Sequence, residues 1–470
     1  MSPKQSWVAT SVSCAVFFEW GISYALLDVM NYIIKKALGI SRRQAALFAM
    51  GYYFAYPFGS TLIASPLLTR CGYRVTMVVG TLILALGTFI MSAGASHCNF
   101  KLMVFGHVVI GLGVSTLERS ANAYAVNCGP RVGAPARILL GQSVAGAGSV
   151  VGPFLARAFI LVNEASTILP EHDRLHPGTC LVPSPDSDVG CGQLGPVVSF
   201  YRSLAVVLVL WAGVLAGVFF GTNWVPEIPI EKSPELKHPW WQIWKHPLAS
   251  FKYSRLWGAM TSNFLNLGCQ VTIAQFFIEH LIVNACKTEH QATNMLAMAQ
   301  GLFVIGRILC FCMTLAGMKI RSLKSRRILL GFLAAATGFT LGGVWAKSAA
   351  AIACIATVMF WESPSFPMIF EAGTAGLDEW QATAETLVIM SISGGGVLPV
   401  LTGMLADEVE VNKAWGLVAG CFGLVTMFPL FLNMLPSWRK AVDVAQEPPK
   451  DGEANEDVEG TEMVTPNRAV

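Results

Sequence analysis

The stretch VTMVVGTLILALGTFIMSAGA, residues 75–95, contains no charged side chain. A run of about 20 such residues has the length that an α-helix needs to cross ~30 Å of hydrocarbon. A second apolar stretch, residues 45–68, precedes it, and the short basic loop TRCGYR at residues 69–74 separates the two. This region predicts two membrane-crossing helices joined by a tight turn.

The same pattern recurs along nearly the whole chain. The predicted spans are residues 7–30, 45–68, 75–95, 102–126, 138–162, 198–220, 256–283, 295–316, 328–345, 350–370, 383–405 and 414–435. The composition agrees, because 54% of the 470 residues are hydrophobic and 13% are charged, whereas about 25% are charged in an average soluble domain. We therefore predict an all-α membrane protein with twelve transmembrane helices in two six-helix bundles.

Two polar segments divide this chain. Residues 223–253, rich in Pro, Lys and Trp, are predicted to form a cytoplasmic interfacial linker between an N-terminal bundle (1–222) and a C-terminal bundle (254–436). Residues 437–470 are predicted to be a disordered acidic cytoplasmic tail, because they offer little to bury. Basic residues are more frequent on one side of the predicted spans, which places both termini in the cytoplasm. No retention signal is present, so the plasma membrane is the expected location.

Several classes of function are excluded. The formal net charge of +3 is too small and too dispersed for a nucleic-acid binder. The glycine clusters lack any nucleotide-binding motif, so ATP is not expected as an energy source, and no catalytic or metal-binding motif indicates an enzyme, a metal or a cofactor. A small-molecule solute and an ion gradient are the partners that remain, and one chain has enough helices to work as a monomer.

Carboxyl groups inside the predicted spans are the main functional signal. Asp28 lies in the first span and Glu118 in the fourth. An ionisable side chain in hydrocarbon costs at least ~2.5 kcal/mol, so it needs a partner or a function. We predict that both carboxyl groups take up and release a proton; the alternatives are that Asp28 is hydrated near the interface and that Glu118 is paired with a base.

Other polar and aromatic side chains in the spans are candidates for solute binding. On the first span, Trp20 and Tyr24 lie one turn apart, and the amides predicted to contact solute are Asn122, Gln142, Asn266 and Gln270. Such amides also form interhelical hydrogen bonds, which is the alternative for each of them. Cys180 and Cys191 share a long loop expected outside, where either a disulfide between them or two free thiols is open.

Four segments give the chain a resemblance to a known family. They are FFEWG through LLDVMN (17–31), GLGVSTLERSAN (111–122), ESPSFPMIF (362–370) and SGGGVLPVLTG (393–403). Together with the basic loop at 69–74, they are similar to the major facilitator superfamily and, within it, to the fucose/glucose/galactose:proton symporter family, especially its fungal-type members. The resemblance implies a major facilitator fold, alternating access and proton symport of a sugar, with Asp28 and Glu118 as the coupling carboxylates and Gln142 as a cavity residue.

The chain also departs from that family pattern. Glu19 and Arg119 replace other residue types, and we hypothesise an ion pair between them; the alternative is that Arg119 holds an anionic solute. Helix five carries Leu139 and Ala145 where the family usually has asparagines. The function predicted first is symport of a hexose or fucose-type sugar, and the alternatives are transport or export of another small polar or amphipathic metabolite, or a sensor that no longer transports.

Overall fold

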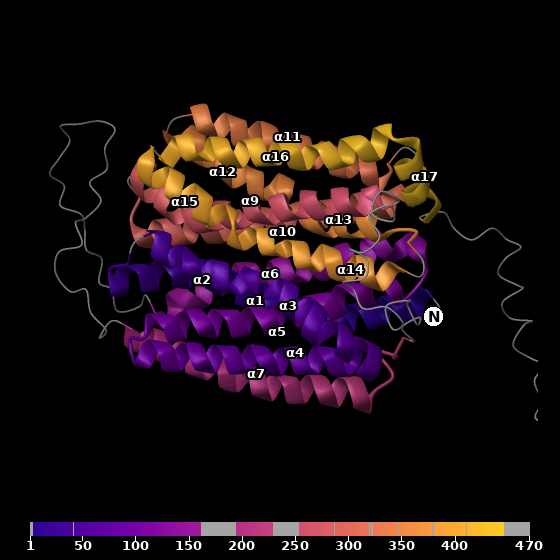
Figure 1. Ribbon diagram of the computed structural model, residues 1–470, viewed down its shortest axis with the longest axis horizontal. Coiled ribbons are helices and arrows are strands. Elements are labelled where there is room, and N and C mark those ends of the chain that lie inside the picture. The colour runs from indigo at the N-terminus through magenta and orange to yellow at the C-terminus, as the bar shows by residue number, and fades with distance from the viewer. Residues whose placement is uncertain are drawn as a thin grey trace, which may run out of the picture.

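A computed structural model describes residues 3–40, 42–160, 194–228 and 253–445, except 286, 319, 321–322, 347, 378–379 and 410. The described part is a set of long helices that run side by side (Figure 1). In that view the helices before the linker fill the lower half and the helices after it fill the upper half. Cys180 and Cys191, together with most of the predicted linker, lie outside the described residues.

The N-terminal half contributes one bundle. Its elements are α1 (Pro3–Leu38), α2 (Arg42–Phe54), α3 (Tyr56–Phe58), η1 (Gly59–Ala64), α4 (Ser65–Ser96), α5 (Phe100–Asn127), η2 (Arg131–Gly133), α6 (Ala134–Ile160) and α7 (Gly195–Gly221). The helix α4 contains both the predicted basic loop and the apolar stretch at residues 75–95. Gly72, with φ 80°, breaks it there, in the left-handed region that favours glycine.

The C-terminal half contributes the second bundle. Its elements are α9 (Ser254–Ala285), α10 (Glu289–Gly317), α11 (Ser325–Trp345), α12 (Ser348–Glu362), α13 (Ser365–Thr374), α14 (Gln381–Met390), η8 (Ser391–Gly396), α15 (Leu398–Glu408), α16 (Val411–Met434) and α17 (Pro436–Ala445). Two spans of this bundle are interrupted. Pro364 separates α12 from α13, because proline lacks an N–H donor, and Gly394–Gly396 separate α14 from α15.

The number of spans agrees with the prediction. Ten stretches of the described residues are long and apolar enough to cross a membrane. One of them, Gln44–Ser96, has 53 residues and is broken at Gly72, so it crosses twice. The 32-residue α9 is also long enough to cross a membrane, and its asparagines and glutamines make it more polar than the other ten stretches. The fold is therefore the predicted twelve-helix arrangement.

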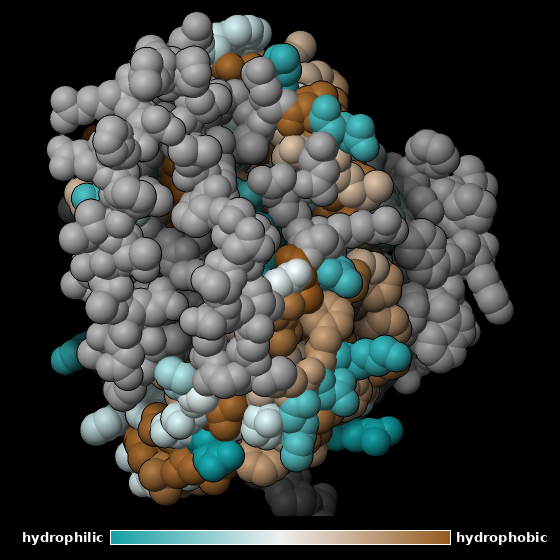
Figure 2. Space-filling view, turned by 90° about the vertical axis from the view of Figure 1, so that its left-hand side faces the viewer, coloured by the Kyte–Doolittle hydropathy of each residue, from teal (hydrophilic) through white to brown (hydrophobic). Residues whose placement is uncertain are grey.

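The outer surface has the apolar character that lipid contact requires. On α7, the side chains of Val206, Val207, Leu210 and Val214 are all more than half exposed. One end of the bundle differs from this surface (Figure 2). There, hydrophilic and hydrophobic side chains are mixed wherever described residues are visible, as expected for an end that faces water.

Glycines let the helices approach closely within and between the bundles. A Cβ atom on Gly21 of α1 would lie 1.9 Å from the carbonyl oxygen of Ala145 on α6, and one on Gly148 would lie 2.4 Å from that of Phe18. Between the bundles, a Cβ on Gly395 would lie 2.8 Å from the ring of Tyr53. The glycine clusters of the sequence are thus positions of close backbone packing.

The predicted boundary of the disordered tail is wrong. Residues Pro436–Ala445 form α17. The ring of Trp438 packs 5.9 Å from that of Phe428, and the carboxylate of Asp443 accepts hydrogen bonds from Lys324 and Arg326. These contacts supply the burial that the sequence did not reveal. Residues 446–470 lie outside the described residues.

Candidate functional site

A cavity lies between the two bundles. Its walls are Trp20, Gly21, Tyr24, Tyr52, Tyr53, Tyr56, Glu118, Ala145, Gly146, Ser149, Leu267, Gln270, Phe303, Arg307, Phe366 and Ile392. The elements α1, α2, α3, α5 and α6 provide one wall, and α9, α10, α13 and η8 provide the other.

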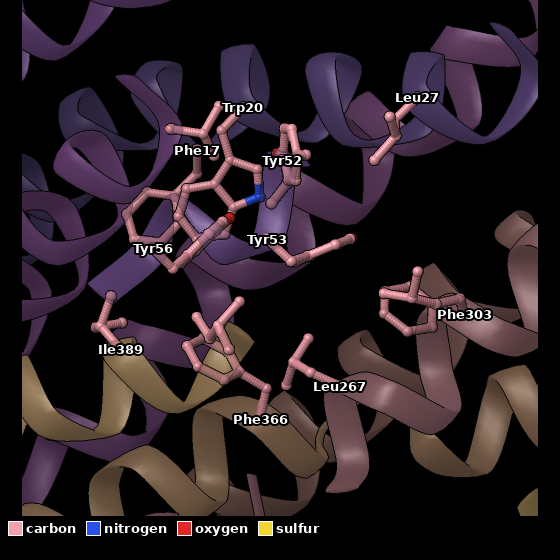
Figure 3. Packing of buried hydrophobic residues seen from close by; sticks show 14 of the residues in the cluster. Phe17, Trp20, Leu27, Tyr52, Tyr53, Tyr56, Leu267, Phe303, Phe366 and Ile389 are labelled. Atoms are coloured by element: carbon pink, nitrogen blue, oxygen red, sulfur yellow. The ribbon is translucent and has the colours of Figure 1, made fainter. Parts of the chain in front are cut away.

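Aromatic rings form a large part of the cavity wall (Figure 3). Tyr52, Tyr53 and Tyr56 come from the end of α2 and the start of α3, with centroids 4.8 Å apart for Tyr52 and Tyr53 and 5.9 Å apart for Tyr53 and Tyr56. They gather with Trp20 on the N-terminal side, and Phe303 and Phe366 lie across from them. Such rings offer a large apolar area together with hydroxyl groups that can bind a polar ligand.

Charged groups of both signs line the same cavity. The carboxyl group of Glu118, from α5, lies close to the Tyr56 hydroxyl, the Asn122 amide and the guanidinium of Arg307. Arg307, from α10, stacks over the ring of Phe303 at 4.3 Å from its centroid. Both charged residues are almost completely buried. The cavity therefore combines an aromatic surface with one acidic and one basic group from opposite bundles.

The predicted solute-binding residues separate into two groups. Trp20, Tyr24 and Gln270 line the cavity. Asn122, Gln142 and Asn266 are buried and do not line it. The Gln142 amide donates a hydrogen bond of 3.0 Å to the Asn122 side-chain oxygen, so these two amides hold α5 and α6 together directly behind Glu118.

The two predicted coupling carboxyl groups are described to different extents. Glu118 lies in the cavity wall, as described above. Asp28 belongs to α1, but its side chain lies outside the described residues. The structure thus gives a location for Glu118 alone.

The predicted ion pair between Glu19 and Arg119 is wrong. Glu19 accepts hydrogen bonds of 3.1 Å from Thr81 of α4 and from Trp211 of α7. It is therefore bound within the N-terminal bundle. Arg119 turns toward the C-terminal bundle, where its guanidinium is bound by α14.

Arg119 instead belongs to a polar cluster that joins the bundles. It donates hydrogen bonds to the Glu385 carboxylate at 2.9 Å, to the Thr386 hydroxyl at 3.0 Å and to the carbonyl oxygen of Ala382 at 3.0 Å. The Asn127 amide donates to Glu385 at 3.1 Å. We call Arg119, Asn127, Gln381, Glu385 and Thr386 the inter-bundle cluster. Because the guanidinium of Arg119 is bound by protein groups, an anionic solute is not its partner in this state.

The inter-bundle cluster lies at one end of the cavity. α5 ends and α14 begins there, at the end of the molecule that carries the N-terminus (Figure 1). Toward the other end, Lys35 of α1 and Glu279 of α9 form an ion pair of 3.5 Å. Contacts between the bundles are thus present on both sides of the cavity.

The sequence prediction did not include Tyr52, Tyr53, Tyr56 or Arg307 among the site residues. A signal was present, because the run YYFAYPFG at residues 52–59 combines three tyrosines with a proline and a glycine inside an apolar span. Interrupted membrane helices are found where backbone lines a cavity. Here α2 and α3 meet at Tyr56, and the breaks before α13 and at η8 lie across from it.

The comparisons with known proteins agree with this architecture. Residues 10–398 match the family described as Major Facilitator Superfamily. The chain belongs to the Major Facilitator Superfamily. It is 21% identical over 420 residues to the L-fucose-proton symporter of Escherichia coli, covering 89% of this chain and 91% of that protein. It is 23% identical over 436 residues to the glucose/galactose transporter of Brucella abortus, covering 91% and 95%.

Solved structures share the fold of this superfamily member. The transporter FucP in its outward conformation matches with a TM-score of 0.69 and 20% identity, covering 91% of this chain and 99% of that one. The xylose transporter XylE of E. coli, partially occluded and inward open, matches with a TM-score of 0.62 and 11% identity over 92% and 99%. The relatives named here are bacterial, so they do not support the predicted fungal-type placement.

Proposed function

We propose that this superfamily member is a secondary active transporter that moves a monosaccharide of the hexose or fucose type together with protons. The observation that carries the proposal is a buried carboxyl group, Glu118, in an aromatic cavity between two six-helix bundles. The names of the relatives, which include fucose-proton symporters and glucose/galactose transporters, support the choice of a sugar and a proton. Transport, rather than enzymatic turnover, is the activity proposed.

Proton coupling is assigned to Glu118 and Asp28. Glu118 has little contact with water, so its ionised form depends on Tyr56, Asn122 and Arg307 around it. Burial favours a neutral carboxyl group, and a nearby cation favours the ionised one. A movement of the bundles that changes the position of Arg307 relative to Glu118 therefore changes its proton affinity, which couples a proton to alternating access.

Sugar binding is assigned to the cavity wall and the layer behind it. Trp20 and Tyr24 offer ring faces, and the Gln270 amide offers a donor and an acceptor to hydroxyl groups. Asn122, Gln142 and Asn266 lie one layer further from the cavity. We propose that they hold Glu118 and the helices around it in position or reach the solute in another state of the cycle.

The protein is proposed to act as a monomer in the plasma membrane, with the N- and C-termini in the cytoplasm. Residues 1–222 and 254–436 then form the two bundles that move against each other, with 223–253 as the linker. In this orientation the inter-bundle cluster closes the cytoplasmic end of the pathway.

One observation favours the second candidate, a transporter or exporter of another small polar or amphipathic metabolite. Ala145 lines the cavity at a position where the resembling family offers an amide. The loss of that amide removes a partner for a sugar hydroxyl, and the aromatic wall suits a more apolar solute. The cavity, the fold and the coupling groups are the same in both candidates.

Uptake of labelled hexoses and fucose into proteoliposomes, with and without an inward proton gradient, tests the proposal. Gradient-stimulated uptake that is lost in Glu118→Gln and in Asp28→Asn supports sugar:proton symport. Glu19→Gln is the matched control, because Glu19 is a buried glutamate of the same bundle that does not line the cavity, and it should retain uptake. A well-folded protein with no flux of any of these sugars would exclude the first candidate and favour the second.

A further inference from the structure

A second buried carboxyl group, Glu362, lies in the C-terminal bundle and has no assigned role. It is the last residue of α12, directly before the break at Pro364. Its side chain is 2% exposed, and neither carboxyl oxygen has a hydrogen-bond partner among the described residues. A buried charge without such partners is costly, so this environment favours the neutral, protonated acid.

Arg307 connects Glu362 to the cavity. Its Nε donates a hydrogen bond of 2.8 Å to the carbonyl oxygen of Ser363, next to Glu362, and its Nη1 donates to the carbonyl oxygen of Gln142 in the other bundle. The guanidinium also interacts electrostatically with both Glu118 and Glu362. One cation therefore stands between a carboxyl group of the N-terminal bundle and one of the C-terminal bundle.

The surroundings of the two acids differ. Tyr56 and Asn122 lie close to Glu118, in addition to Arg307. Among the described residues, the titratable groups that interact with Glu362 are Arg307 from α10 and the thiol of Cys269 from α9. Two ionised carboxylates would leave one uncompensated negative charge in a region of low dielectric constant. Of the two acids, Glu118 is therefore the one more readily ionised, because it has polar neighbours, and Glu362 is the one that more readily keeps a proton.

Movement of the bundles changes the distance between Arg307 and Glu118 but not the distance between Arg307 and Glu362. Arg307 and Glu362 belong to the same bundle, whereas Glu118 belongs to the other. When the bundles separate at the hydrogen bond between Arg307 and the Gln142 carbonyl, Glu118 loses its counter-charge and Arg307 remains beside Glu362. Glu118 then binds a proton from water in the cavity, and Glu362 releases one to that water.

We propose that Glu362 is a second proton-carrying group, which shares the positive charge of Arg307 with Glu118 and is protonated when Glu118 is ionised. One proton is bound and one is released in each exchange, so the total charge of Arg307 and the two acids is conserved. This proposal rests on the proposed proton-coupled transport, but its protonation step can be measured without any solute.

Infrared spectroscopy of the purified protein, without solute, provides the first test. Protonated carboxylic acids have a C=O stretch that ionised ones lack, and its intensity is followed against pH. Glu362→Gln should remove a band that persists at neutral pH in the wild type. The matched control is Glu371→Gln, another buried glutamate of the same bundle, which should leave that band in place because Glu371 interacts with Arg255 rather than Arg307.

If the C=O band is unchanged in Glu362→Gln, the proposal is refuted. Should this variant not yield monodisperse protein, Glu362→Asp replaces it, because a shorter acid in the same place must shift the frequency or the pH dependence of the band. An Arg307→Gln variant should raise the intensity at neutral pH, since both acids then lack a counter-charge. Equal intensity in Arg307→Gln and wild type would also overturn the shared counter-charge.

Transport measurements form the second arm. In Glu362→Gln, no second acid competes for Arg307, which therefore remains the partner of an ionised Glu118. Gradient-driven accumulation of solute should then fall to the level seen without a gradient, while exchange of labelled for unlabelled solute continues. Normal accumulation in this variant would refute the role in coupling. If the wild type transports no sugar, the proposed function is wrong, but the infrared measurement still tests whether Glu362 is protonated, because it needs no solute.

Discussion

Removal of the Arg119 guanidinium is expected to open the end of the cavity where α5 and α14 meet. The Arg119–Glu385 ion pair is nearly inaccessible to solvent, with side chains 4% and 2% exposed. Its members come from different bundles. Arg119→Gln therefore leaves the carboxylate of Glu385 buried without its cation in the closed state, whereas separation of the bundles allows water to reach it.

The magnitude follows from the burial of this pair. Breaking a buried ion pair by removal of one partner costs about 3–5 kcal/mol. Asn127 and Gln381 continue to donate hydrogen bonds to Glu385 in the variant, so we take the lower limit. About 3 kcal/mol corresponds to a change of about a hundredfold in the equilibrium between closed and open forms, since each 1.36 kcal/mol is a factor of ten.

A cysteine next to Asn127 of the inter-bundle cluster reports this opening. Val126 lies one helical turn from Asn122 toward the end of α5 and is buried. In a background that lacks the exposed Cys71 and Cys312, Val126→Cys should react with a membrane-impermeant maleimide up to about a hundredfold faster when Arg119→Gln is added. The reagent is applied from the side of the membrane that carries the N-terminus.

The double variant Arg119→Gln/Glu385→Gln is the control. It removes both charges, and a pair replaced by neutral groups often loses little stability or none. Its alkylation rate should therefore return toward that of the parent. Equal rates in the parent and in Arg119→Gln would refute the reasoning, because they would show that this ion pair does not hold the bundles together.

Three further predictions concern single positions. Gly21→Ala should destabilise the protein by about 1–3 kcal/mol, seen as a lower Tm in detergent, because its methyl group overlaps the Ala145 carbonyl. Glu19→Gln should leave the Tm nearly unchanged, since the amide oxygen of glutamine still accepts hydrogen bonds. A large fall in the Tm of this variant would contradict the prediction. Burial tends to raise the pKa of Asp443, but the hydrogen bonds and charges of Arg326 and Lys324 outweigh it and lower this pKa. Its ionised form therefore stabilises the fold above pH ~4, and this contribution is lost as the pH falls below that value. Asp443→Asn should cost about 1 kcal/mol at neutral pH and abolish this acid-dependent part of the stability.

The helical architecture could be predicted from the sequence because its cause is local. The length of an apolar stretch is set by the thickness of the bilayer, and each stretch can be judged by itself. The break at Gly72 was predicted as the basic loop at residues 69–74, whereas the break at Pro364 falls inside the predicted span 350–370. The prediction failed at α17, whose burial depends on how it packs against other helices: Trp438 contacts Phe428 of α16, and Asp443 binds Arg326 of α11, which is distant in the sequence.

The cavity was only partly predictable for the same reason. Helical spacing placed Trp20 and Tyr24 on one face of the first span, and both line the cavity. The spacing could not tell that Asn122 and Gln142 turn toward each other, because that depends on how α5 packs on α6. The position of Arg307 between two acids likewise follows from the assembly of both bundles.

Glu19 and Arg119 show that opposite charge alone does not predict which side chains form an ion pair. Glu19 and Arg119 have opposite signs and lie on helices of the same bundle, yet each is bound elsewhere. Glu19 joins α1 to α4 and α7 through Thr81 and Trp211, so its hydrogen bonds remain intact when the bundles move as rigid bodies. Arg119 joins α5 to α14, so its bonds must break in any movement that opens this end. The hydrogen bonds of Glu19 therefore contribute to the stability of one bundle, whereas those of Arg119 contribute to the equilibrium between conformations.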